Sequence, residues 1–84
     1  MAEYFELVTA DNVTLANAQT KAVYLDKKVA IQALFTEVQL AAAQHSIDSR
    51  YCRFLELDNK IAVDYGAWGD FIGLTNVTIA DLDA

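Results

Sequence analysis

Hydrophobic residues recur at helical spacing through the middle of the chain. One set follows the three-and-four spacing of an amphipathic helix face, and its members are Leu15, Ala18, Ala22, Leu25 and Val29. The spacing continues on a shifted face over residues 31–45, and a second amphipathic stretch covers residues 47–65. Polar residues 45–49 separate the two stretches and indicate a break. The pattern predicts two or three helices within about residues 14–65.

Both ends of the chain indicate extended structure. Residues 4–8 are aromatic and β-branched, and residues 74–79 form a second strand-like run. Asn-Val-Thr followed by an aliphatic residue occurs at 12–15 and again at 76–79. We therefore expect the ends to pair as a small antiparallel sheet, within one chain or between copies. The predicted fold is one small domain over residues 1–84, mainly α, a helical hairpin or small bundle with short extended or β segments at both termini.

Length and charge restrict the classes of function. The 84 residues suffice for one domain. The net charge of −6 opposes direct nucleic-acid binding, because that surface needs clustered Lys and Arg. Residues 1–20 and 61–84 contain acidic residues and no basic ones. Acidic ends keep a hydrophobic body soluble, and they also suit docking on a basic neighbour.

The sequence offers little catalytic or metal-binding chemistry. Cys52 and His45 are the only soft metal ligands, too few for a zinc site. His45 is the candidate general base, and a helix continuing through Ser46 would place Asp48 on the same face, as an orienting group or a helix-end ion pair. Cys52 lies between apolar neighbours and is interpreted as a buried structural thiol. We expect no enzyme activity, no cofactor and no metal.

The compartment is predicted from the N-terminus and the cysteine. The first residues show neither the basic nor the apolar region of a secretory signal, and one unpaired cysteine fits a reducing compartment. The longest weakly charged run, Val29 to Ser46, is too polar for a membrane span. We expect synthesis in the cytoplasm and no membrane association.

Excess hydrophobicity is the main functional clue. Hydrophobic residues make up 55% of the chain, more than so small a domain hides by itself. Residues 29–46 are apolar around most of a helical circumference, which predicts burial on most sides through self-association or permanent docking. The aromatic, glycine-rich loop 66–73 either anchors a partner or covers the end of the hairpin. The interface candidates are Ile31, Leu34, Phe35, Val38, Trp68 and Phe71.

The composition carries one resemblance. The chain is short and lacks Pro, has few basic residues, is rich in Ala, Val, Thr, Asn and Asp, and has extended ends. In these respects it resembles small virion components of tailed bacteriophages. The resemblance implies a non-enzymatic structural or assembly subunit in a head or tail, with further copies or other subunits as partners. The alternative is an acidic inhibitor or adaptor that binds a basic surface of a partner protein.

Overall fold

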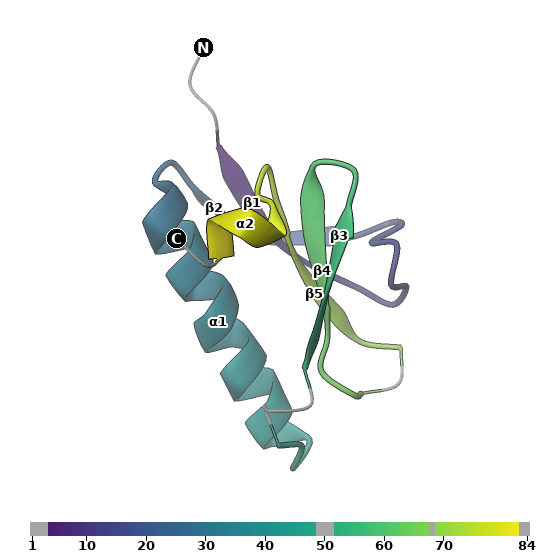
Figure 1. The fold of residues 1–84 in the computed structure, drawn as a ribbon. Helices are drawn as coiled ribbons and strands as arrows, with labels where there is room; N and C mark the ends of the chain where they lie inside the picture. Colours follow the sequence, from purple (N-terminus) through teal and green to yellow (C-terminus); the bar gives the residue numbers. More distant parts are fainter. Residues whose placement is uncertain (1–3, 49–51, 68, 83–84) are drawn as a thin grey trace.

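A computed structural model describes residues 4–48, 52–67 and 69–82. Over these residues the chain forms a five-stranded antiparallel sheet in the order β2-β1-β5-β4-β3, one long helix and one short helix (Figure 1). The elements in chain order are β1 (Phe5–Ala10), β2 (Gln19–Tyr24), α1 (Lys27–Gln44), β3 (Arg53–Leu57), β4 (Lys60–Asp64), β5 (Phe71–Thr75) and α2 (Ile79–Leu82).

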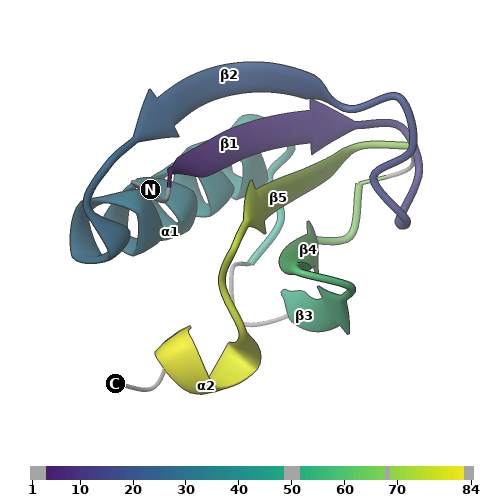
Figure 2. The same ribbon diagram turned by 90° about the horizontal axis from the view of Figure 1, so that it is seen from above.

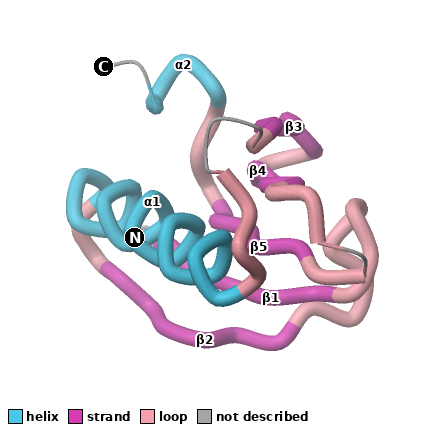
Figure 3. Tube along the Cα trace, turned by 90° about the horizontal axis from the view of Figure 1, so that it is seen from below, coloured by secondary structure: helices cyan, strands magenta, loops and turns pink. Residues whose placement is uncertain are grey.

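The sheet curves around α1, which lies in its concave side (Figures 2 and 3). The helix buries one residue in every four, Ala30, Leu34, Val38 and Ala42, so that a single stripe faces the strands. The strands meet this stripe with alternate side chains that include Phe5, Leu7, Ile61, Val63, Ile72 and Leu74. The main core therefore lies between α1 and the concave face.

The convex face has a smaller core, which the β1–β2 loop covers. Leu15 of this loop packs with Val8 of β1 and Ala62 of β4, and all three are buried. Leu15 lies directly over Gly73 of β5, where an added Cβ would collide with the Leu15 Cδ1 atom and lie 3.1 Å from the carbonyl oxygen of Ile61. Gly73 is therefore required for close approach of the loop to the sheet.

Replacing Gly73 with Ala is expected to destabilise the protein by about 1–3 kcal/mol, because Leu15 must move out of a packed site. Urea unfolding followed by circular dichroism measures the change. Combining Gly73→Ala with Leu15→Ala should cost less than the sum of the two single changes. Gly69→Ala is the matched control, since no atom lies within 4 Å of an added Cβ there and only the left-handed backbone is strained. Equal losses for Gly73→Ala and Gly69→Ala would contradict the steric explanation.

The prediction of a mainly α, helical protein is wrong. Most of the described residues between 14 and 65 form strands and loops, and α1 is the one helix among them. The apparent helical face at Leu15–Val29 combines three different environments. Leu15 covers the convex face, Ala22 packs toward α1 from β2, and Leu25 and Val29 are exposed. Their three-and-four spacing is therefore a coincidence of loop, strand and helix start.

The predicted helix over residues 47–65 is instead the β3–β4 hairpin. Leu57 pairs with Lys60 across the two-residue turn Asp58-Asn59, and Asn59 has a left-handed backbone with φ 58°. Asparagine tolerates this conformation better than other non-glycine residues. A two-residue turn between two short apolar runs favours a hairpin, and the helical spacing concealed it.

The prediction that the chain ends pair is confirmed, and the pairing is within one chain. β1 and β5 are antiparallel neighbours at the centre of the sheet, with Leu7 opposite Leu74 and Val8 opposite Gly73. The first predicted segment, 4–8, matches β1 within two residues. The second, 74–79, is correct only through Thr75, because Asn76 adopts φ 62° and the chain then turns into α2.

The end of α1 falls where the polar run indicates a break. The amide of Ile47 donates to the carbonyl of Ala42 and that of Ser46 to the carbonyl of Ala43, the two bonds of a Schellman motif. Ile47 packs with Ala42 in the main core. The residue at the left-handed position is Ser46, with φ 57°, where glycine is usual.

Replacing Ser46 with Gly is expected to stabilise the protein by about 1 kcal/mol, because glycine adopts the left-handed backbone without steric cost. Urea unfolding midpoints measure the effect. Ser46→Ala is the control, and it should not stabilise. A midpoint that falls in the glycine variant would show that the serine side chain supports the helix end in another way.

Candidate functional site

Large hydrophobic side chains remain exposed on the surface of one copy. The exposed fraction is 53% for Val23, at the end of β2, and reaches 77% for Leu25, just after it. α1 adds three more, Val29, Phe35 and Leu40, and the others are Tyr4 and Ile79. Single exposed apolar residues are ordinary, but Val23, Leu25 and Val29 lie close together in the sequence around the β2–α1 turn.

The predicted interface residues fall in different environments. Leu34 and Val38 are buried against the sheet of their own chain, so they belong to the core. Ile31 is half-buried, and Phe35 is exposed and makes an edge-on contact with Phe54 of β3, with ring centroids 5.7 Å apart. Phe71 packs beside the convex core, and Trp68 lies outside the described residues. Of the six candidates, Ile31 and Phe35 line one surface groove, and Phe71 lines a separate pocket beside the β4–β5 loop.

This groove lies between α1 and α2 and has a volume of about 430 Å³. Its lining combines apolar and charged side chains, namely Lys27, Lys28, Ile31, Gln32, Phe35, Asp81 and Leu82. The apolar side chains of this lining, Ile31, Phe35 and Leu82, form a surface suited to packing.

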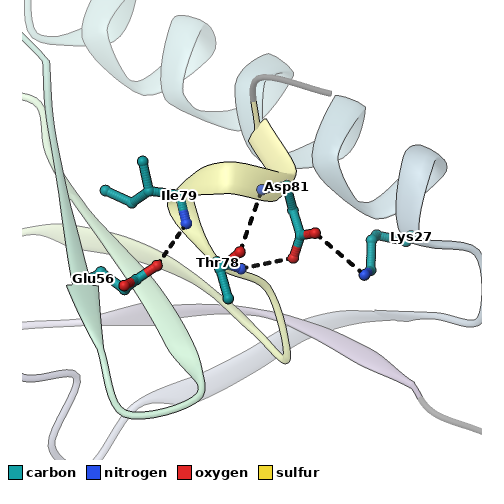
Figure 4. Close-up of polar contacts among 5 residues, drawn as sticks. All are labelled: Lys27, Glu56, Thr78, Ile79 and Asp81. Atoms are coloured by element: carbon teal, nitrogen blue, oxygen red, sulfur yellow. Dashed lines mark hydrogen bonds and ion pairs between the residues drawn. The ribbon is translucent and has the colours of Figure 1, made fainter.

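Polar contacts hold α2 beside the groove (Figure 4). The Thr78 amide donates to Asp81 and the Asp81 amide donates to the Thr78 hydroxyl, a reciprocal helix-start cap. The Ile79 amide donates to Glu56 of β3, and Lys27 of α1 lies 3.4 Å from the Asp81 carboxylate. The hydrogen bond from the Thr78 amide, together with Lys27, holds the pKa of Asp81 below its usual value. The short helix is thus tied both to the sheet and to α1.

A polar cluster joins His45, Tyr65 and Asp70 near the end of α1. The Tyr65 hydroxyl donates to the Asp70 carboxylate, and the His45 Nε2 lies 3.6 Å from the same oxygen. The His45 and Tyr65 rings are in contact, with centroids 5.9 Å apart. Tyr65 is fully buried, whereas His45 is exposed. The contacts fasten the β4–β5 loop to the end of α1, which is a structural role.

A helix does not continue through Ser46 to place His45 and Asp48 on one face, because α1 ends at Gln44. The carboxylate beside the imidazole is Asp70, from the β4–β5 loop. The spacing along the sequence gave no signal for this contact, because His45 follows α1 whereas Tyr65 and Asp70 lie in the β4–β5 loop. An oriented imidazole alone does not make a catalytic site, because the contacts of the cluster include no serine, threonine or cysteine nucleophile among the described residues.

Cys52 is half-buried and packs against the main core. Burial raises the pKa of its thiol, and the carboxylates of Asp64 and Asp48 raise it further. The reactive thiolate is therefore disfavoured at neutral pH. This environment agrees with a structural thiol. No group of three or more His, Cys, Asp or Glu residues within the described ranges is arranged to hold a metal ion.

Tyr65 is expected to make stability fall at alkaline pH. Burial, followed by the bond to Asp70, raises the pKa of its phenol above the ordinary value of 10.0. A group whose pKa is raised by folding contributes stability in full below its unfolded pKa, and the contribution is lost as the pH rises above that value. Urea midpoints should therefore decline above about pH 10. Tyr65→Phe should be less stable at pH 7 and lose less between pH 9 and 11, and an unchanged decline would contradict the assignment.

Comparison with known proteins gives no relative for this chain: no family model, no curated protein and no solved structure matches it. Among the helices of the described residues, none is long and apolar enough to cross a membrane.

Proposed function

We propose that this protein is a non-enzymatic assembly subunit that associates with further copies of itself or docks permanently in a larger complex. The observation that carries the proposal is the set of large hydrophobic side chains left exposed after the chain has packed both faces of its sheet, with Leu25 exposed to 77% and Leu40 to 55%. Burying apolar surface is the main driving force of permanent association. The partners are further copies or other subunits, with no direct nucleic-acid or membrane contact.

The larger complex that we propose is a head or tail of a tailed bacteriophage. The compositional resemblance to small virion components supports this role. In this proposal the protein is made in the cytoplasm and incorporated into a virion.

An acidic inhibitor remains the second candidate because of the net charge of −6. However, several carboxylates have partners inside the chain, which favours a structural use of charge. Asp26 caps α1, Glu37 pairs with Lys21 and Asp64 with Arg53, and Glu56, Asp70 and Asp81 also have partners.

Molar mass in solution tests the proposed function. Light scattering after size-exclusion chromatography should give a discrete oligomer whose mass is the same at low and high salt, because apolar contacts resist screening. Asp11→Asn and Asp58→Asn, at exposed carboxylates, are controls that should leave the mass unchanged.

A monomer at both salt concentrations would contradict self-association. A monomer that binds polylysine at low salt and releases it at high salt would favour the acidic inhibitor instead.

A further inference from the structure

The two edges of the sheet differ in how they are protected. At the β3 edge, two of the five strand residues are charged, and both are engaged: Arg53 lies 2.8 Å from Asp64, and Glu56 accepts from the first residue of α2. α2 also packs against this strand. A covering element of this kind prevents a sheet edge from pairing with another chain.

The β2 edge has weaker protection. Within the described residues β2 pairs only with β1, which leaves its outer backbone groups without a strand partner. Its six residues, Gln19–Tyr24, include neither Pro nor Gly and extend over about 20 Å. An unpaired edge is a template for another strand, and the register irregularity at Lys21 divides this edge into the regular runs 19–20 and 22–24.

The one charge on β2 is neutralised within the chain. Lys21 would ordinarily oppose edge pairing, but its ammonium group forms an ion pair with Glu37 of α1. Lys21 lies at the irregularity where the β1–β2 register shifts. The strand therefore presents little net charge to an approaching partner.

Apolar side chains flank the same edge. Val23 points away from α1, because its neighbours Ala22 and Tyr24 pack into the main core, and 53% of it is exposed. Leu25 follows at the end of the strand, and Val29 is exposed in the first turns of α1. A strand added at this edge would shield Val23 and Leu25 from water.

We infer that two copies of this chain join through β2, antiparallel about a twofold axis, to form one continuous sheet. The inference rests on the proposed self-association and names its surface. Identical strands in antiparallel pairing satisfy each other's backbone groups in the same way on both sides, which is the requirement of a twofold interface. The two Lys21 side chains lie near the axis in a centred pair, so their neutralisation by Glu37 is a condition of assembly.

Val23→Lys tests the surface directly. The substitution places a positive charge at an exposed position on the edge, and a twofold dimer contains this charge in both copies. The dissociation constant should therefore rise about tenfold or more. Ile79→Lys is the matched control, because Ile79 is also exposed and lies in α2 near the opposite edge. Light scattering gives the mass across a dilution series, and circular dichroism verifies that both variants fold.

A single and a double charge-removing variant test the role of Glu37. Glu37→Gln leaves Lys21 charged and unpaired, so dimerisation should weaken several-fold. The double variant Lys21→Gln with Glu37→Gln removes both charges and should restore it. A structural role for the ion pair within one chain would instead make the double variant no better than the single one.

Hydrogen exchange supplies a second readout. Amides in residues 19–24 should become more protected as the wild-type concentration rises, while those of β3 should not change. An oligomer that is unaffected by Val23→Lys and shows no protection of β2 would overturn the β2 interface and leave the proposed assembly role intact. A wild-type monomer at all concentrations would overturn both. Masses that increase without limit would indicate β2-to-β3 chains and would also overturn the twofold dimer.

Discussion

The antiparallel pairing of β1 with β5 is the contact on which the rest of the structure depends. It joins the two ends of the chain at the centre of the sheet and sets Val8 opposite Gly73. The β2 hairpin extends the sheet on one side of this pair and the β3–β4 hairpin on the other. Because most contacts across the pair are distant in sequence, neither half of the chain completes the core without the other.

This central pair also determines how each face of the sheet is covered. Leu7 and Leu74 turn toward α1, while Val8 and Gly73 turn toward the loop that carries Leu15. The missing side chain at Gly73 provides the space into which Leu15 packs. The long helix α1 thus covers the concave face of the sheet, and a loop covers the convex face (Figures 2 and 3).

The sequence predicted the features that depend on local patterns. The pairing of the ends follows from their β-branched composition, and the end of α1 follows from the polar run at 45–49. The strands between them were missed because a strand, a turn and a helix start happened to reproduce helical spacing from Leu15 to Val29. The cluster of His45, Tyr65 and Asp70 had no local signal, because only the fold brings those segments together. An exposed edge is likewise a property of strand order, which periodicity does not contain.

The high hydrophobic content of the chain has a different explanation in this fold than in a helical hairpin. In a helical hairpin, the apolar residues of 29–46 would have been the surface for a partner, yet Leu34 and Val38 lie in the core. With both faces of the sheet covered from within the chain, most of the exposed large apolar side chains lie on α1 and around β2, and the others are Tyr4 and Ile79. A curved sheet closed on its faces still ends at its edges. Because α2 packs against the β3 edge, growth costs least at the β2 edge. Association at that edge adds strand pairing to apolar burial without rearranging the core.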